Sequence, residues 1–196
     1  MHMGETTNSK GARRRTEILK VARASLIDGG YGKFSMREIA ARLDTKLGHL
    51  QYYFPSKNDL LEALVRAEFK TNLATVKSIA EKALEENDAI KRAIKALLQQ
   101  WMSEGAKIYA VTTFLGLHDE RFHDVHQELN ESFYDVLDGL LSSTGTGVSG
   151  SNMPRQKLRL ITALIDGALL HTTGDIQVDD QFFEATAEPV KTIAQS

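Results

Sequence analysis

The residues between Ser35 and Lys57 offer a dense set of hydrogen-bond donors and positive charges. They read Ser-Met-Arg-Glu-Ile-Ala-Ala-Arg-Leu-Asp-Thr-Lys-Leu-Gly-His-Leu-Gln-Tyr-Tyr-Phe-Pro-Ser-Lys. Ammonium, guanidinium, imidazole, amide and phenol groups recognise phosphate oxygens and base edges. The spacing predicts a helix over 35–43, a turn at 44–46 and a second helix over 47–53. Because so short a helix pair cannot bury its apolar sides alone, we expect a compact scaffold that presents the second helix to the DNA major groove.

The segment from His118 to His126 is another place where residue types suggest chemistry, in this case metal binding. It holds three histidines and three acidic residues. Spacing lets Glu120, His123 and Asp124, or the pair His123 and His126, share one face of a helix. The same groups at a helix junction also form a cap and a solvated face. A metal-responsive regulator is therefore the alternative interpretation.

Sequence signals for catalysis are missing. The chain has no Cys, which excludes a disulfide framework, a thiolate metal site and a cysteine nucleophile. It has neither a Gly-rich phosphate loop nor a nucleophile motif. A pair of catalytic carboxylates leaves no signature in one sequence, so the residues alone do not exclude it. We expect a protein that is not an enzyme and that has no cofactor.

Charge is distributed unevenly along the 196 residues. Residues 1–57 carry 11 Lys and Arg against 5 Asp and Glu, a balance of +6, whereas the remainder carries 13 against 21, a balance of −8. Together they give the net charge of −2. A chance fluctuation would give the same numbers, but the asymmetry favours a protein in which only the N-terminal part meets a polyanion.

Targeting and membrane signals are not apparent. Residues 1–15 contain no apolar core of a signal peptide, and no stretch is long and apolar enough to cross a bilayer. Hydrophobic residues form 42% of the chain, enough for a core, and only three Pro occur, which suits helices. We expect a cytoplasmic protein without a membrane partner.

Hydrophobic periodicity predicts an all-α chain with no strand and no internal repeat. Beyond the helix pair, further helices are predicted over 13–28, 56–85, 88–103, 106–117, 121–141, 154–173 and 179–194. Residues 1–10 are expected to form a flexible arm and 142–152 a flexible loop. We divide the chain into a helix-turn-helix DNA-binding domain over 1–55 and a helical domain over 56–196.

Local signals define helix ends near the turn. A capping box is predicted at Ser35-x-x-Glu38, in which the Ser hydroxyl accepts the Glu38 amide and the carboxylate reaches back. Ser56-x-x-Asp59 resembles a second cap. Asp44 belongs to the few residue types besides Gly that tolerate left-handed turn geometry.

Three other helices carry their own signals. The helix over 13–28 is expected to end at Gly29-Gly30, since Gly adopts the left-handed C-cap conformation without a Cβ penalty. The last helix is expected to be kinked or split at Pro189. The helix over 154–173 has apolar residues on more than one stripe, so we expect it to be buried on two sides.

Taken together, these residues resemble the N-terminal part of the TetR family of bacterial repressors. The likeness is carried mainly by three segments: Gly30-Tyr31, Ser35–Ala40 and Gly48–Lys57. It covers about the first third of the chain, and the Phe-x-Ser-Lys sequence after the second helix of the pair is its most specific part. Residues 164–167, Leu-Ile-Asp-Gly, resemble more weakly the ligand domain of the betaine-regulator type in that family.

The resemblance implies a homodimer whose N-terminal three-helix units read a palindromic operator in double-stranded DNA. By the same resemblance, the all-helical domain over 56–196 is a ligand-binding and dimerisation domain, which holds an unknown small-molecule effector that releases the DNA. The last two long helices, about 154–173 and 179–194, build the dimer as a four-helix bundle. This agrees with the two-sided burial that the apolar pattern predicts for 154–173.

The resemblance also implies which residues contact DNA. The implied set is Arg14, Ser35, Arg37, Lys46, Leu47, Gly48, His49, Gln51, Tyr52, Tyr53 and Lys57. Lys46 to His49 open the recognition helix against the bases, Tyr52 and Tyr53 match positions that touch phosphates, and Lys57 matches a phosphate-binding lysine. Arg14 lies in a run of three arginines, which suits either a DNA-contacting arm or a solvated helix start.

Three residues depart from the family pattern. Asp44 replaces the usual turn Gly, Lys46 replaces a common capping Ser, and Gln51 replaces a common Tyr. Asp44 adds a negative charge near phosphates, and Gln51 has the amide geometry that reads adenine. The operator sequence is therefore not transferable from other members of the family.

The ligand pocket is only weakly defined by the sequence. Its candidate lining residues are Trp101, Tyr109, Phe114, Phe133, Asp166 and His171. Ordinary packing explains the aromatic members equally well. Asp166 and His171 interrupt an apolar helix, and they are either polar groups of the pocket or satisfied polar groups of the core.

Overall fold

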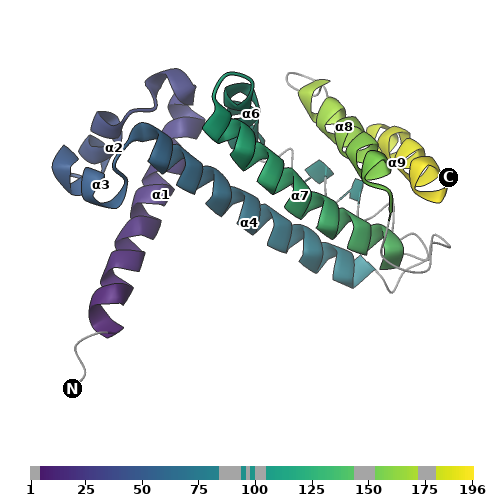
Figure 1. Cartoon of the computed structure of the whole chain (residues 1–196), viewed down its shortest axis with the longest axis horizontal. Helices are drawn as coiled ribbons and strands as arrows, with labels where there is room; N and C mark the ends of the chain where they lie inside the picture. Colours follow the sequence, from purple (N-terminus) through teal and green to yellow (C-terminus); the bar gives the residue numbers. More distant parts are fainter. Residues whose placement is uncertain (1–4, 84–93, 96–97, 100–104, 144–152, 172–179) are drawn as a thin grey trace. The chain divides into compact units, whose positions relative to one another are not determined.

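The computed structural model describes all residues except 1–4, 84–93, 96–97, 100–104, 144–152 and 172–179 (Figure 1). The described residues form helices and no strand, which confirms the predicted all-α class. The helices are α1 (Glu5–Lys33), α2 (Met36–Arg42), α3 (Leu47–Tyr53), α4 (Lys57–Ala83), α6 (Gly105–Gly116), α7 (Glu120–Ser143), α8 (Arg155–His171) and α9 (Asp180–Gln195). Among the described helices, none is both long enough and apolar enough to cross a membrane.

The first helix differs from its prediction at both ends. It begins at Glu5 rather than near residue 13, so residues 5–10 are helical instead of forming an arm. No Pro interrupts this segment, and its acidic first residue favours a helix N-terminus. The predicted break falls on Gly30, whose φ of 67° and ψ of 176° are not helical, and a further turn then runs to Lys33.

The later helices follow their predictions more closely. The helix predicted over 88–103 lies mostly outside the described residues, as does the loop predicted over 142–152. The last helix is not split, since α9 continues through Pro189. Ala187, Val190 and Ala194 are buried on both sides of this proline, so packing holds the helix together although Pro cannot donate its backbone hydrogen bond.

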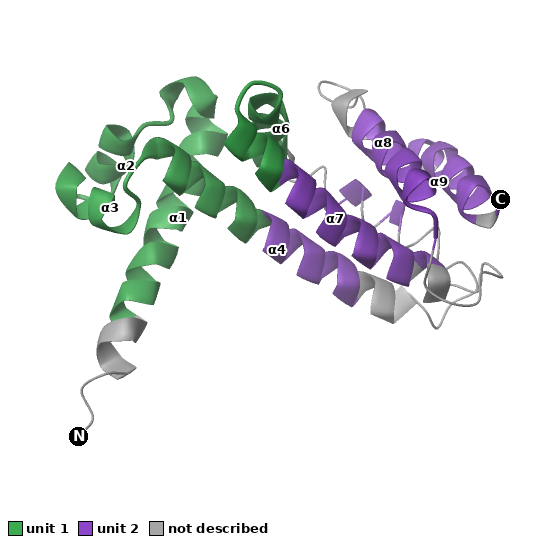
Figure 2. Ribbon diagram, viewed as in Figure 1, with its two compact units in different colours: residues 1–68, 107–125 green, residues 69–106, 126–196 purple. Residues whose placement is uncertain are grey.

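The chain divides into two compact units, which Figure 2 colours separately. The first unit comprises residues 1–68 and 107–125, and the second comprises 69–106 and 126–196. The first unit thus extends beyond residue 55 and takes in part of α4, most of α6 and the start of α7. The functional boundary expected at residue 55 stays a prediction.

The first unit is built around one apolar core. Its fully buried side chains come from all the helices of the unit: Ile18, Ala22, Leu26, Phe34, Ile39, Leu50, Phe54, Leu60, Leu61, Leu64, Ile108 and Phe122. The short helices α2 and α3 contribute few of them, because each has only seven residues. Their position therefore depends on the long helices α1 and α4, as the sequence predicted.

In the second unit, α8 and α9 pack side by side (Figure 1). The inner face of α8 is fully buried and carries Leu158, Ile161 and Ile165. Arg155, at the start of α8, forms an ion pair with Asp135 of α7 at 2.7 Å. These contacts fix α8 on α7 and α9 within one protomer.

Candidate nucleic-acid interface

The helix pair starts at Ser35, where the structure forms one of the two hydrogen bonds of the predicted capping box. The Ser35 hydroxyl accepts a hydrogen bond from the Glu38 backbone N–H at 3.2 Å, as expected for an N-cap. The Glu38 carboxylate does not reach back to Ser35. It accepts a hydrogen bond from the buried Ser25 hydroxyl of α1 and pairs with Arg42. One carboxylate therefore fastens α2 to α1 instead of closing a local box.

The turn between α2 and α3 has the predicted left-handed residue. Asp44 has a φ of 46°, the one positive φ of a non-glycine residue in the described part of the chain. Lys46 then occupies the N-cap of α3 without a side-chain capping bond. The first backbone N–H groups of α3 and the exposed ammonium of Lys46 therefore lie at one end of the helix, which favours an anionic oxygen.

Helix α3 divides into an inner apolar side and an outer polar side. Leu50 is its one buried residue, and Phe54 directly after it is buried as well. Gly48, His49 and Gln51 are exposed on the other side. A helix with so polar an outer surface is suited to the hydrogen-bonding edges of bases in the major groove.

Aromatic rings support each other along the outer side of α3. Tyr52 is 80% exposed, and its ring meets the edge of the Tyr53 ring with centroids 5.1 Å apart. His49 lies one turn earlier, 5.7 Å from the Tyr53 ring, and its Nδ1 is 3.1 Å from the Thr45 hydroxyl. These contacts orient Tyr52 and His49 although neither is buried.

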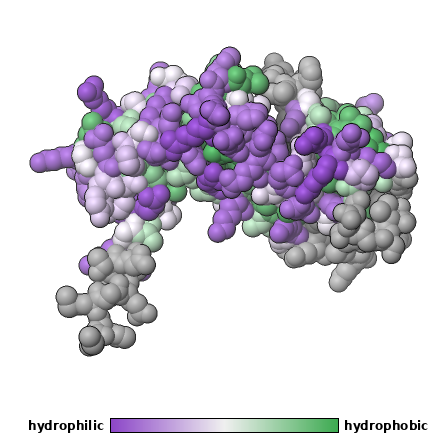
Figure 3. Space-filling model, viewed as in Figure 1, coloured by the Kyte–Doolittle hydropathy of each residue, from purple (hydrophilic) through white to green (hydrophobic). Residues whose placement is uncertain are grey.

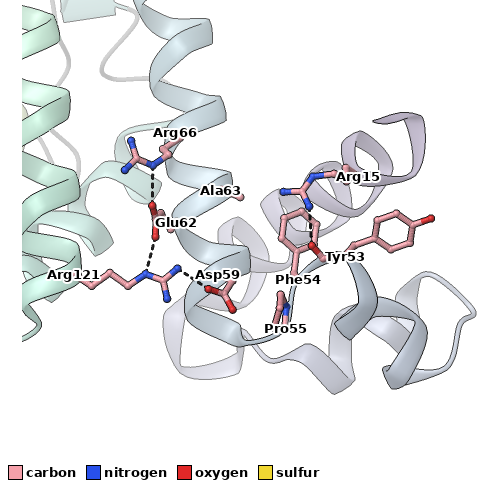
Figure 4. A pocket seen from close by; sticks show the side chains of 9 residues that line it. All are labelled: Arg15, Tyr53, Phe54, Pro55, Asp59, Glu62, Ala63, Arg66 and Arg121. Atoms are coloured by element: carbon pink, nitrogen blue, oxygen red, sulfur yellow. Dashed lines mark hydrogen bonds and ion pairs between the residues drawn. The ribbon is translucent and has the colours of Figure 1, made fainter. Parts of the chain in front are cut away.

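The C-terminal end of α3 is held by Arg15 of α1. Its guanidinium donates a hydrogen bond to the Tyr53 backbone oxygen at 2.8 Å and lies 4.3 Å from the centre of the Phe54 ring. In Figure 4 both contacts are visible, and the Tyr53 phenol points away from Arg15. The carbonyls of the last helical turn have no partner within a helix, so Arg15 supplies one.

The next helix, α4, begins at a complete capping box. The Ser56 hydroxyl accepts from the Asp59 backbone N–H at 3.2 Å, and the Asp59 carboxylate accepts from the Ser56 backbone N–H at 2.9 Å. The same carboxylate pairs with Arg121 of α7 at 2.6 Å. Hydrogen bonds from Ser56 and Arg121 hold the pKa of Asp59 below its ordinary value.

Arg121 also contacts Glu62 at 2.7 Å, one turn further along α4. These ion pairs and the Arg15 contact border an open cleft of about 370 Å³ (Figure 4). The cleft is lined by Arg15, Tyr53, Phe54, Pro55, Asp59, Glu62, Ala63, Arg66 and Arg121. The chain segment after α3 is therefore fixed from α1 on one side of the cleft and from α7 on the other.

Lys57 is turned toward the protein more than the sequence implied. Its ammonium lies 3.8 Å from the centre of the Tyr31 ring and 3.4 Å from the Tyr31 backbone oxygen. Partial burial lowers the pKa of Lys57. The lysine therefore joins the start of α4 to the end of α1, and its contact with a phosphate stays a prediction.

Comparison with known proteins agrees with this geometry. Residues 18–64, which include both short helices and the start of α4, match the family described as bacterial regulatory proteins, tetR family. This N-terminal segment therefore belongs to the TetR family. The matched family consists of regulatory proteins, which agrees with the expectation that the chain is not an enzyme.

The relatives are similar to different extents. A stretch of 70 residues is 40% identical to the HTH-type transcriptional repressor KstR of Rhodococcus jostii, and it covers 35% of this chain and 33% of that repressor. A TetR-family regulator from Mesorhizobium loti has the same fold, with a TM-score of 0.75 and 17% identity over 94% of this chain and 96% of its own. A transcriptional regulator from Saccharomonospora viridis, solved in complex with choline, gives a TM-score of 0.72 at 17% identity over 92% of this chain and 96% of its own.

All the residues that the TetR resemblance assigns to DNA lie in the first compact unit. Arg37, Lys46, Gly48, His49, Gln51 and Tyr52 are exposed. Ser35 is engaged in its cap, and Arg14 forms an ion pair with Glu17 at 2.6 Å. The structure gathers the set on the helix pair and its flanks, and the contacts of each member with DNA stay predictions.

Sequence reasoning did not find Arg15 or Arg121. The arginine run at 13–15 was interpreted as an arm or a solvated helix start, and Arg121 lies within the segment considered for metal. Their partners are 38 and 62 residues away along the chain, so no local spacing points to them. The buried Ser25 in an apolar helix face was a signal, because a buried hydroxyl needs a partner.

The candidate ligand residues are distributed over both units. Tyr109 and Phe114 belong to the first unit, where Phe114 is 60% exposed, and Phe133 is buried in the second. Trp101 lies outside the described residues, and so does the side chain of His171. Their role in binding a ligand stays a prediction.

Asp166 has an unusual environment for a carboxyl group. It lies on α8, and burial raises its pKa to about 6. No hydrogen bond or ion pair to its side chain occurs among the residues that the structure describes. Its two interpretations, a polar group of the pocket and a satisfied polar group of the core, both stay predictions.

The metal-responsive alternative receives no support. In the described part of the chain, which includes all of 118–126, no three His, Asp or Glu side chains are placed to hold a metal ion. The segment instead forms a turn and the start of α7, where Asp119 accepts from the Arg121 backbone N–H and the His118 ring lies against Phe114. This corresponds to the cap and solvated face that were its other interpretation.

Proposed function

We propose that the protein is a homodimeric transcriptional repressor that binds a palindromic operator and leaves it when a small molecule binds. The observation that supports this most directly is α3, a helix whose inner side is fixed by Leu50 and Phe54 while its exposed outer side offers imidazole, amide and phenol groups. The name repressor, carried by the KstR relative, agrees with the direction of regulation.

The outer faces of α8 and α9 support the dimer. On α8, Leu160 is 53% exposed and Ala163 is exposed too, on the side opposite the buried Ile161 and Ile165. Figure 3 shows hydrophobic residues gathered over α8 and α9, while hydrophilic residues cover much of the rest of the described surface in that view. Exposed apolar residues on α8, next to the adjacent helix α9, fit a second copy of the same pair, packed as a four-helix bundle.

The ligand is proposed to act by preferring one conformation of the dimer. A small molecule releases DNA only if it binds more tightly to a state in which the two recognition helices no longer match the operator. The buried carboxyl of Asp166, whose pKa is raised by burial, gives the second unit an acidic group that a cation would hold in its charged form. A related regulator holds choline, so quaternary ammonium compounds belong in a ligand panel beside neutral and anionic ones.

The decisive experiment selects bound duplexes from random DNA and then measures affinity for the selected sequence over a range of salt concentrations. We expect a palindromic sequence and a steep salt dependence, with log K falling by about 0.9 per phosphate contact against log salt. Failure to enrich any sequence would contradict the proposal. Repeating the measurement with the ligand panel then tests release.

Two substitutions separate base reading from phosphate binding. Gln51→Ala should reduce the preference for the selected sequence by roughly tenfold at one base pair, with little change in salt slope. Lys46→Gln should weaken binding to every duplex and reduce the salt slope by about 1. Lys70→Gln, at an exposed position on α4 in the second unit, is the matched control and should change neither quantity.

A further inference from the structure

The end of the recognition helix is fastened by a residue from another helix. The Tyr53 carbonyl closes α3, and it accepts its hydrogen bond from Arg15, 38 residues earlier in the chain. The Arg15 guanidinium also lies over the ring of Phe54, which is 1% exposed and follows α3 directly. One side chain thus contacts both the last residue of α3 and the residue that turns the chain away from it.

So short a helix needs such a contact. A helix of seven residues is not stable alone, and only Leu50 within α3 is buried. Leu50 and Phe54 fix the depth of the helix in the core. A planar guanidinium that donates along one direction and stacks along another also restricts how the helix end rotates and tilts.

Arg15 differs from the other arginines of its run. Arg13 is exposed and makes no hydrogen bond or ion pair with any described residue, whereas Arg14 pairs with Glu17 on the same helix. Only Arg15 reaches α3 (Figure 4). Arg15 is exposed, but its guanidinium donates to Tyr53 and lies over Phe54, in a run of charges whose composition alone suggests binding to phosphates.

We infer that Arg15 is a positioning residue for base reading, which acts through Tyr53 and Phe54 and does not bind phosphate. The inference rests on the proposed DNA binding and adds to it the group that orients the recognition helix. An interaction can bias the orientation of the helix by no more than its own free energy. We therefore expect its loss to cost about tenfold in specific affinity per recognition helix, and up to about a hundredfold for a dimer on two half-sites.

The test compares Arg15→Lys, which keeps the charge but loses the fork and the stacking plane, with Arg15→Met, which loses the charge as well. Both are measured on full-length protein with the duplex selected by the wild type and with a scrambled duplex of the same length. The readouts are the ratio of the two affinities and the salt slope. Arg13→Lys and Arg13→Met are matched controls on the same helix.

If Arg15 positions α3, Arg15→Lys lowers the ratio of specific to non-specific affinity by at least about tenfold and leaves the salt slope unchanged. A variant that merely unfolds would lower both affinities together, and thermal unfolding of each protein checks for that. If Arg15→Met does not fold, Arg15→Lys decides alone. The inference would be overturned if Arg15→Lys bound both duplexes with the affinity of the wild type. It would also be overturned if Arg15→Lys lost the same affinity on both duplexes and had a smaller salt slope. If the wild type selects no sequence, the proposed function fails instead.

Discussion

The helix-turn-helix and the α8–α9 pair differ in the contacts that hold them and in the side chains that they leave exposed. Around α2 and α3, polar side chains from α1 and α7 tie down helix ends: Ser25 holds Glu38, Arg15 holds Tyr53, and Arg121 holds Asp59. On the α8–α9 pair, the inner faces are buried while apolar groups such as Leu160 stay exposed. One region is complete within a protomer and presents polar groups, whereas the other presents apolar surface.

This difference indicates what each region can bind. A polar surface with directed donors gains little by meeting another apolar surface, but it can exchange its water for the donors and acceptors of a nucleic acid. An exposed apolar face gains most when a similar face excludes water from it. The difference therefore supports the proposal that the first region binds DNA and that the other region binds a second copy of the chain.

The largest expected effect concerns the exposed apolar residues of the α8–α9 pair. Leu160→Glu places a charge in the middle of the proposed dimer contact, where burial without a partner costs several kcal/mol. We expect the dimer dissociation constant to rise by about 100-fold or more, measured by analytical ultracentrifugation. Leu117→Glu changes a leucine that is 75% exposed in the first unit and is the control. Equal association of both variants would contradict the assignment of this face.

The next effect tests how much the stability of the helix-turn-helix depends on Leu50, the single buried residue of α3. Leu50→Ala should lower the free energy of unfolding by about 2–4 kcal/mol, because it removes the one side chain of α3 that is fully inside the core. Urea unfolding followed by circular dichroism measures the change. Leu117→Ala, at an exposed position, should stay within about 0.5 kcal/mol of the wild type.

Asp166 provides a pH-dependent test of the α8–α9 region. Its pKa of about 6 in the folded protein lies above the value of 3.8 for an unperturbed group, so the folded state binds the proton more tightly. The free energy of unfolding should therefore fall as pH rises from about 4 to about 6, by on the order of 2 kcal/mol from this group. Asp166→Asn should be more stable than the wild type at pH 7.5, and this gain should disappear near pH 4. A constant difference across this range would show that burial of the charge is not the cause.

The smallest expected effect tests the caps of the helix-turn-helix. Ser35→Ala removes the acceptor for the Glu38 amide and should lower the free energy of unfolding by about 1 kcal/mol. Chemical denaturation at constant pH provides the measurement. Ser132→Ala, within α7 and exposed, is the control because its hydroxyl caps no helix end. A loss at Ser132 as large as at Ser35 would remove the cap as the explanation.

The short helices were predictable because their limits are encoded locally. Ser35 starts α2, Asp44 permits the left-handed turn, and Pro55 prevents α3 from continuing, so the predicted range 47–53 coincides with α3. The all-α class followed from hydrophobic spacing for the same reason. Signals of this kind act within one or two helical turns, which is the distance a single sequence resolves.

The contacts that orient these helices were not predictable. The partner of Arg15 is 38 residues away and that of Arg121 is 62 residues away, and many other carbonyls and carboxylates would serve equally well in the sequence. Glu38 was expected to accept from the nearby Ser35, but the packing of α2 on α1 brings its carboxylate to the distant Ser25 hydroxyl instead. The candidate ligand residues stay predictions for a related reason, since aromatic and acidic groups in a sequence do not reveal which cavity they line.

The first compact unit is discontinuous in the chain, since residues 107–125 complete what 1–68 begin. A ribosome adds about 5–20 residues per second, so some seconds pass between the emergence of α3 and that of Arg121. During that interval the nascent helix-turn-helix already has Arg15, but it lacks the ion pairs to Asp59 and Glu62 and the apolar cover of Ile108 and Phe122. The helix-turn-helix is thus synthesised first, but it gains its full set of contacts only after the middle of the chain has followed it.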